Sequence, residues 1–423
     1  MNYKKTTLKN GLRIITAPMK DTQTATVMVM VGVGSRYEKD EERGLSHFIE
    51  HMMFKGTKRR PNTQIIANEL DAIGGEFNAF TGKISTAYYA KSDAKHLDKT
   101  LDVISDMFLN SKFDAKEIEK ERGTILQELN MYEDMPMRSV EDVFEGLLYD
   151  RDQKLGREII GTKETIDEVK RKDFIDYVKR FYISGDTVVC VAGKIDEAKV
   201  IKKIEKIFAS MSQGLKPDFE KVIEKQVAPQ IKIKNKKTDQ THLVLGVRAY
   251  EDNHKDKYVL SLLSIILGGN MSSRIFINVR ERQGLAYYVH TGTESYQETG
   301  YLATFAGVEH KNLVKAVETI LAEYKKIAIK KVTAQELQKA KDFIKGKSVM
   351  GLESSDSVAS FLIGQEIMRE KILTPKEIFK KIDKVTQEDI LRVARDIFVN
   401  EKLNLALTGP HKKSKELESV LKF

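Results

Sequence analysis

The chain contains very little cysteine and proline. Of its 423 residues, one is cysteine (Cys190) and seven are proline. A single cysteine cannot form an intrachain disulfide or a cysteine-rich metal cluster, which favours a reducing compartment. Hydrophobic residues make up 41% and charged residues 31% of the chain. This balance excludes a disordered or fibrous protein and allows sizeable hydrophobic cores.

Long apolar runs are also missing. The most apolar stretches, residues 25–34 and 259–268, are far shorter than the roughly 20 residues that cross a bilayer. The opening segment MNYKKTTLKNGLRIITAP lacks both the apolar core of a signal peptide and the Arg- and Ser-rich character of a transit peptide. We therefore expect a soluble, cytoplasmic protein with no membrane partner.

The formal net charge of +9 raises the question of a nucleic-acid partner. In residues 112–122 (KFDAKEIEKER) lysines are interleaved with glutamates, which is typical of a solvated helix face. The dense basic clusters, residues 55–60 and 232–237, lack the interleaved aromatic residues that single-strand binders use. We expect no nucleic-acid binding; the alternative would show salt-dependent affinity.

Apolar patterning predicts alternating strands and helices. Strands are expected at residues 12–16, 24–33, 86–91 and 187–192, and helices at 96–109 and 114–132. After Met211 the pattern lapses into a stretch that contains Pro217 and Pro229. We therefore predict a domain at 1–212, a linker at 213–229 and a second domain at 230–423.

The two halves resemble each other. In the first, a strand ending in YYAK precedes AKHLDKTLDVISDMF and then DAKEIEKER; in the second, strands precede EHKNLVKAVETILAEY and then TAQELQKAK. This order predicts a duplicated domain and an α+β fold. The alternative is that helices of similar composition merely look alike.

Two of the eight histidines fall in the pentapeptide His47-Phe48-Ile49-Glu50-His51. On a helix, positions i, i+3 and i+4 share one face, so both imidazoles and the carboxylate converge. Two imidazoles can bind Zn²⁺ together with a third protein ligand, and a neighbouring carboxylate can take a proton from the bound water. H-x-x-E-H is the motif of inverted zinc peptidases.

An acidic residue on a second helix is the expected third ligand. Glu121 and Glu128 lie seven positions apart, two turns along one helix face. Glu128 stands beside apolar residues and is the stronger candidate, with Glu121 orienting a histidine. The alternative is an ordinary charged helix surface.

Three segments, HFIEHMMFKGT, GGEFNAFTGKISTAYYAK and ERGTILQELNMYED, together resemble the pitrilysin family of metallopeptidases. The similarity is strongest to the branch of the mitochondrial processing peptidase and small bacterial peptidases. It implies that His47, His51 and Glu128 bind one zinc ion per chain, that Glu50 is the general base and that Glu121 assists catalysis. It also implies two homologous domains, each a mainly antiparallel sheet packed with helices, that form half of a clamshell.

The second half resembles the family's C-terminal signature in LGGNMSSRIFINVRERQGLAYYV. This resemblance assigns substrate contacts to Arg280 and Tyr287, whose side chains can donate hydrogen bonds to a developing oxyanion. Ala340 and Lys347 align with Glu121 and Glu128, and the second half has no His pair at the equivalent of HxxEH. We expect a catalytically silent copy that completes the site.

A substrate strand is implied at residues 77–81 (FNAFT), where the family adds the peptide to an edge strand. Asn78, Ala79 and Phe80 are the substrate-binding candidates; an interior strand paired on both edges is the alternative. The predicted activity is zinc-dependent endopeptidase cleavage of unfolded peptides or presequence-like segments inside a dimer chamber. A homodimer is favoured over a heterodimer, because one chain carries both the zinc motif and the Arg/Tyr pair. A non-catalytic assembly subunit of the same family stays an alternative.

Overall fold

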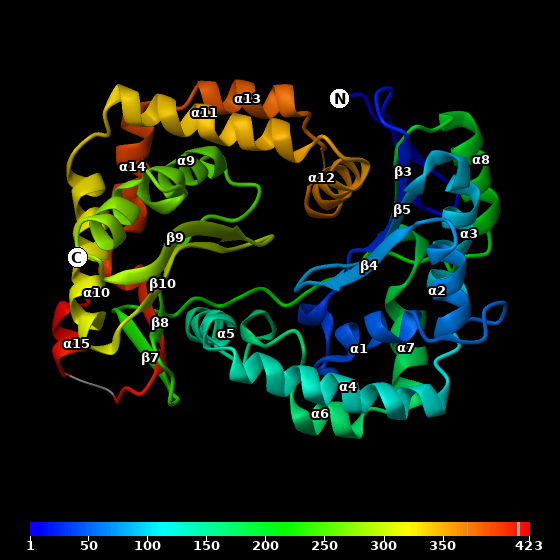
Figure 1. The fold of residues 1–423 in the computed structure, drawn as a ribbon, viewed down its shortest axis with the longest axis horizontal. Helices are drawn as coiled ribbons and strands as arrows, with labels where there is room; N and C mark the ends of the chain where they lie inside the picture. The colour runs from blue at the N-terminus through cyan, green and yellow to red at the C-terminus, as the bar shows by residue number, and fades with distance from the viewer. Residues whose placement is uncertain (370, 413–414) are drawn as a thin grey trace. The chain divides into compact units, whose positions relative to one another are not determined.

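Two compact units make up the chain. The computed structural model describes residues 1–369, 371–412 and 415–423. Each unit has one β-sheet with helices packed against it (Figure 1), which confirms the predicted two-domain α+β class. The first unit comprises Met1–Leu129, Glu158–Glu220 and Val349–Thr374, and the second comprises Asn130–Arg157, Lys221–Ser348 and Pro375–Phe423.

The sheet of the first unit has six strands. In spatial order they are β1 (Lys4–Thr7), β2 (Arg13–Pro18), β6 (Thr187–Gly193), β3 (Thr24–Val31), β5 (Thr86–Asp93) and β4 (Glu76–Thr81). β2 and β6 are parallel, and all other neighbours are antiparallel. Four of these strands lie within two residues of the predicted bounds at each end, because their apolar runs are bounded by polar turns.

Helices cover both faces of this sheet. The helices that lie wholly or mostly in this unit are α1 (Leu45–Met53), α2 (Thr63–Asp71), α3 (Leu97–Asn110), α4 (Ala115–Asp134), α6 (Lys163–Glu168), α7 (Arg171–Phe181), α8 (Glu197–Phe208) and α12 (Ser355–Met368). Val27, Val29 and Val31 of β3 point into a core shared with α1, α3, α7 and α8. The opposite face of the sheet, including Met28 and Cys190, packs against α12. Cys190 is therefore fully buried, as expected for a structural residue.

The sheet of the second unit repeats this topology. Its order is β7 (Gln230–Asn235), β11 (Leu403–Gly409), β8 (Thr241–Ala249), β10 (Gly300–Val308) and β9 (Ala286–Ser295). β7 and β11 are parallel and the rest antiparallel, as in β2-β6-β3-β5-β4. The shared order and direction of five strands supports the predicted duplication.

The helices of the second unit are α5 (Pro136–Leu148), α9 (Lys257–Gly268), α10 (Leu313–Ile329), α11 (Ala334–Gly351), α13 (Pro375–Asp383), α14 (Gln387–Ile397) and α15 (Lys415–Val420). Two of the five unit boundaries fall inside helices: residues 129 and 130 lie in α4, and residues 348 and 349 lie in α11. Apolar residues of α9, α10 and α14 form one continuous core with the strands.

The units differ from the continuous halves expected from the sequence. Residues 213–229 contain neither helix nor strand. However, α5, from the first half of the chain, packs on β7, β8 and β11, and α12, from the second half, packs on β2, β3 and β6. These two helices occupy equivalent positions in the repeat. Apolar patterning could not reveal this exchange, because an apolar helix face does not specify which sheet it covers.

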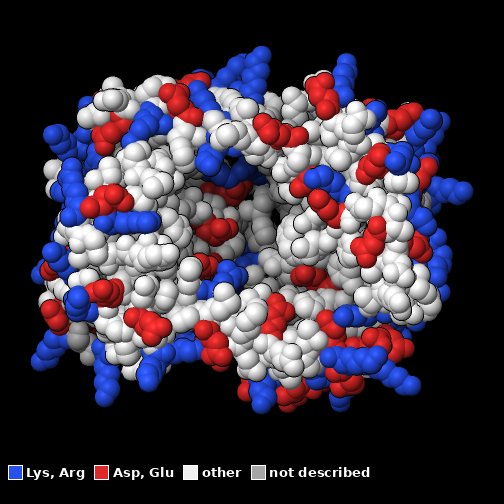
Figure 2. All heavy atoms as spheres, viewed as in Figure 1, with Lys and Arg blue, Asp and Glu red and all other residues white. Residues whose placement is uncertain are grey.

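Charged side chains of both signs are intermingled on the face shown in Figure 2. One of the two dense basic clusters, residues 55–60, is partly internal: Arg60 is 4% exposed and is paired with acidic side chains. Arg60 is therefore part of a structural network, whereas Lys58 and Arg59 of the same cluster are exposed. Within the described residues, no helix has the length and apolar character needed to span a membrane.

Candidate metal centre

Helix α1 presents the HxxEH motif. Phe48, Ile49 and Met52 are almost completely buried, and they fix which side of the helix faces the core. His47, Glu50 and His51 are only partly buried and share another side. The structure therefore has the helical arrangement that the spacing predicts.

Two residues fix the start of α1. Gly44 has a φ of +87°, and a Cβ there would lie 2.4 Å from the carbonyl oxygen of Ile160, so only glycine fits. The carboxylate of Glu38 accepts hydrogen bonds from the backbone N–H groups of Gly44 at 2.9 Å and Ser46 at 2.7 Å. Burial raises the pKa of Glu38 to about 7. These contacts satisfy helix N–H groups that have no intrahelical partner.

Three potential metal ligands converge between α1 and α4. Nε2 of His47 lies 3.7 Å and Nε2 of His51 lies 3.5 Å from Oε2 of Glu128. Zinc ligands at about 2.0–2.2 Å in a tetrahedral arrangement are about 3.3–3.6 Å apart. These three side chains therefore fit a zinc ion. In the described parts of the chain, no other group of three His, Cys, Asp or Glu side chains converges in this way.

Electrostatics favour a neutral His47. Burial, together with the proximity of His51, lowers the pKa of His47 to about 4. The imidazole is then uncharged at neutral pH and has a lone pair available for a metal ion. Two histidines whose ring centroids lie 4.6 Å apart would repel each other if both were protonated.

Glu121 lies two turns before Glu128 on α4 and contacts the other side of His51. Its Oε1 is 2.8 Å from Nδ1 of His51, and its Oε2 is 2.5 Å from Nζ of Lys55. Burial works to lower the pKa of His51, but the hydrogen bond to Glu121 and the charge of Glu128 outweigh it and raise the pKa. A carboxylate at Nδ1 holds the tautomer in which Nε2 faces the metal position.

Glu50 is held by a residue from another element. Thr81, at the end of β4, donates a hydrogen bond from Oγ1 to Oε2 of Glu50 at 2.6 Å. Burial raises the pKa of Glu50 above its ordinary value, although this hydrogen bond opposes the shift. The strand thus fixes the orientation of the carboxylate next to the metal ligands.

β4 is an edge strand. In the described structure it pairs with β5 alone, which excludes the alternative of a strand paired on both edges. Asn78 and Phe80 are exposed, and Ala79 is half-buried on the opposite face. The backbone on the open side of β4 can accept another strand. The binding of substrate by these residues stays a prediction.

Arg280 and Tyr287 belong to the second unit. Arg280 lies in the π-helical segment Phe276–Glu281, with its guanidinium 5.1 Å from the centroid of the Phe276 ring. Tyr287, near the start of β9, is 76% exposed. The three potential zinc ligands all lie in the first unit. Joint action of these ligands with Arg280 and Tyr287 stays a prediction.

Two family models match most of the chain. The model described as Insulinase (Peptidase family M16) matches residues 13–163, and the one described as Peptidase M16 inactive domain matches residues 168–343. The chain belongs to peptidase family M16. This confirms the resemblance to pitrilysin-type peptidases. The HxxEH motif lies in the first M16 segment, and Ala340 and Lys347, which offer no carboxylate, lie in or just beyond the second.

M16 relatives match this chain along almost its whole length. The Bacillus subtilis uncharacterized zinc protease YmxG is 37% identical over 415 residues, 96% of this chain and 98% of that protein. A Rickettsia felis uncharacterized zinc protease is 35% identical over 412 residues, 97% of this chain and 98% of that protein. Both matches therefore span almost the whole length of the proteins compared.

Two solved structures share the fold. A protease from Helicobacter pylori has a TM-score of 0.89 at 23% identity and covers 97% of this chain and 99% of its own. A peptidase M16 inactive domain from Pseudomonas fluorescens has a TM-score of 0.90 at 16% identity and covers 98% of this chain and 100% of its own. At these identities the comparison supports the fold and not the activity.

The sequence did not predict two polar residues of this M16 site, Thr81 and Lys55. The period of two along a strand places Thr81 on the same face as Phe77 and Ala79, which pack against the core that includes α1. That alternation was a usable signal. No comparable signal exists for Lys55, because a single lysine within a basic cluster does not indicate which residue of α4 it contacts.

Proposed function

We propose that this M16 protein is a zinc-dependent endopeptidase that cleaves unfolded peptides or presequence-like segments. The observation that carries the proposal is the convergence of His47, His51 and Glu128, with Glu50 on the same side of α1. An open zinc site with three protein ligands is typical of catalysis rather than of structural zinc. The protein is further proposed to act in the cytoplasm.

His47, His51 and Glu128 would hold the zinc ion, which would supply Lewis acidity toward a peptide carbonyl and lower the pKa of water to near 7. Glu50 accepts a proton from the attacking water and delivers it to the departing amine. Burial raises the pKa of Glu50, which favours the return of the proton to the departing amine. Glu121 orients His51, and Thr81 orients Glu50.

The proposed substrate is an extended peptide that adds to the open edge of β4 at Asn78, Ala79 and Phe80. Backbone pairing does not depend on side-chain identity, so it suits varied sequences. Arg280 and Tyr287 are proposed to donate hydrogen bonds to the carbonyl oxygen as it gains negative charge. The exposed Tyr287 phenol is free to do so without breaking a core contact.

The proposed assembly is a homodimer, because one chain carries a complete set of zinc ligands and the Arg/Tyr pair. A fully active protein that elutes at monomer mass in gel filtration would contradict it. A heterodimer, in which a different M16 chain is the partner, is the alternative; it requires that the purified chain alone be inactive although loaded with zinc.

Removal of zinc is expected to abolish cleavage. An internally quenched, unstructured peptide of about 15–25 residues is long enough to occupy an extended edge strand. Treatment with a chelator followed by its removal should eliminate the fluorescence increase, and one equivalent of Zn²⁺ per chain should restore it. Cleavage that persists in metal-free protein would refute the zinc mechanism. A zinc-loaded but inactive protein would favour the non-catalytic or heterodimer alternative.

Thr81→Val is expected to lower kcat by about 10- to 100-fold and to leave KM within about 2-fold. The variant removes a hydrogen bond to a charged carboxylate, an interaction worth about 1.5–3 kcal/mol, without changing the side-chain size. Steady-state cleavage of the quenched peptide measures both constants. Thr81→Ser is the matched control, because it keeps the hydroxyl and should retain most of the activity. An unchanged kcat in the valine variant would show that Thr81 does not orient Glu50.

A further inference from the structure

Lys55 contacts the metal centre through Glu121. Its ammonium nitrogen lies 2.5 Å from Oε2 of Glu121, while Oε1 of the same carboxylate is 2.8 Å from Nδ1 of His51. The Glu121 side chain is 8% exposed and that of Lys55 is 23% exposed. The two oxygens of one buried carboxylate are therefore held from opposite sides, by a proposed zinc ligand and by a lysine.

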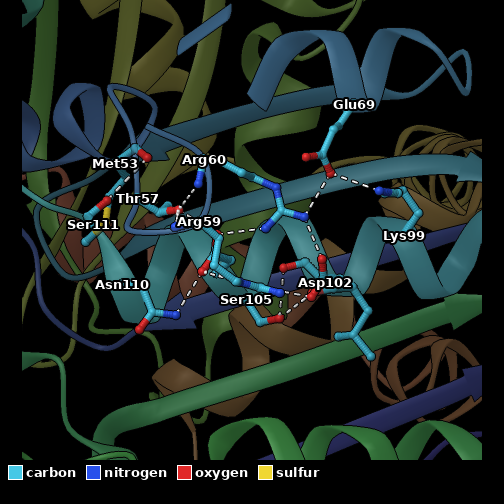
Figure 3. A network of polar contacts seen from close by, with 12 residues as sticks. Met53, Thr57, Arg59, Arg60, Glu69, Lys99, Asp102, Ser105, Asn110 and Ser111 are labelled. Atoms are coloured by element: carbon cyan, nitrogen blue, oxygen red, sulfur yellow. Dashed lines mark hydrogen bonds and ion pairs between the residues drawn. The ribbon is translucent and has the colours of Figure 1, made fainter. Parts of the chain in front are cut away.

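The loop that carries Lys55 is firmly anchored. Lys55 lies two residues after the end of α1, and its N–H donates to the carbonyl of Met52 at 3.1 Å. The next part of the loop is tied to α3 by the polar network around Thr57 and Arg60 (Figure 3). In its buried part, Thr57 and Arg60 donate to Oδ2 of Asp106 at 2.6 and 2.7 Å. The position of the Lys55 backbone is therefore fixed independently of Glu121.

We propose that Lys55 is a positioning residue that holds Glu121 against His51 and so strengthens metal binding. The proposal rests on the proposed zinc site. A buried carboxylate is costly without a cationic partner. With Lys55 present, rotation of the Glu121 carboxylate would break one charge-assisted hydrogen bond at each oxygen. Without Lys55, Glu121 keeps the single hydrogen bond to His51 and can turn toward water, which leaves the imidazole less firmly oriented.

The effect of charge alone has the opposite sign. Removal of a positive charge close to a cation site would by itself make Zn²⁺ bind more tightly. A lower affinity after removal of Lys55 therefore cannot come from this charge effect, and it is the result expected from the loss of orientation through Glu121 and His51. The sign of the change separates the two effects.

The test compares zinc binding in the wild type and in Lys55→Met, Lys55→Gln, Lys55→Arg and Lys58→Met. Zinc dissociation constants are measured on the full chain by competition with a coloured chelator at fixed pH, and the melting temperature of each metal-free protein is recorded alongside. Lys55→Met and Lys55→Gln should bind zinc about 10-fold more weakly, the lower end of what outer-sphere partners contribute. Lys55→Arg should recover most of the affinity, because a guanidinium can also hold a carboxylate. Lys58, exposed in the same loop, is the control for a change of charge and should show no loss.

Three outcomes would contradict the inference. Lys55→Met could bind zinc as tightly as the wild type or more tightly. The melting temperature of the metal-free variants could fall while zinc affinity stays unchanged, which would make the contact purely structural. A wild type that binds no zinc would overturn the proposed zinc site and this inference together, whereas the first two outcomes overturn this inference alone.

Discussion

Glu50→Gln is expected to lower the rate of peptide cleavage by about 10²- to 10⁴-fold while the protein keeps its zinc, because a general base contributes about that much. The amide has nearly the same shape as the carboxylate and can still accept the hydrogen bond from Thr81, but it cannot take a proton from water at neutral pH. Cleavage of the quenched peptide and zinc content should be measured on the same preparation. The loss should appear in kcat.

The matched control is Glu41→Gln. Glu41 is exposed and lies shortly before α1, so this variant should cleave the peptide at the wild-type rate. Equal activity of Glu50→Gln and the wild type would mean that a contaminant or a different site cuts the peptide. Loss of zinc together with activity in Glu50→Gln would also contradict the assigned role, because Glu50 is proposed to lie beside the metal and not among its ligands.

Arg60→Ala is expected to lower the free energy of unfolding by about 3–5 kcal/mol, as for other broken buried ion pairs. The guanidinium of Arg60 donates to Asp106 at 2.7 Å and to Glu69 at 2.8 Å (Figure 3). The Asp106 side chain is 0% exposed, so the variant leaves a buried carboxylate without its principal cation. Urea unfolding followed by circular dichroism measures the difference.

Arg59→Ala serves as the control for Arg60→Ala. Arg59 also contacts Asp102 and Asp106, but its side chain is 56% exposed. Arg59→Ala should therefore lower the free energy of unfolding by about 1 kcal/mol or less. Equal destabilisation by the two variants would show that burial does not determine the strength of this network.

The effect of Arg60→Ala should also depend on pH. Burial works to raise the pKa of Asp106, but hydrogen bonds from Thr57 and Arg60 outweigh it, so the pKa lies below its usual value. A carboxyl with a lowered folded-state pKa stabilises the protein above its unfolded pKa of about 4, and this contribution is lost as the pH falls through the folded-state value. The difference in the free energy of unfolding between wild type and Arg60→Ala should be constant above about pH 5 and should decrease at lower pH.

The sequence was informative wherever one element determines the geometry. The i, i+3, i+4 spacing of His47, Glu50 and His51 fixed their common side of α1, and the seven-residue spacing of Glu121 and Glu128 placed both on one side of α4. Continuous apolar runs such as TVVCVAG predicted buried strands. In each case the period of the helix or strand determines the outcome without reference to the rest of the chain.

Contacts between elements were beyond that reasoning. The bonds from Thr81 to Glu50 and from Lys55 to Glu121 join residues 31 and 66 positions apart in the chain, and no local period specifies such a pair. The exchange of α5 and α12 between the two sheets has the same cause. Both helices have apolar faces, and only tertiary packing decides which sheet each one covers.

Zinc binding by His47, His51 and Glu128 is tested most directly by a crystal structure of zinc-loaded protein, with anomalous data collected on both sides of the zinc absorption edge. We expect one zinc peak per chain, about 2.0–2.2 Å from Nε2 of His47, Nε2 of His51 and a carboxylate oxygen of Glu128. Catalytically active crystals that show no zinc peak at these three side chains, or a peak held by other residues, would contradict it.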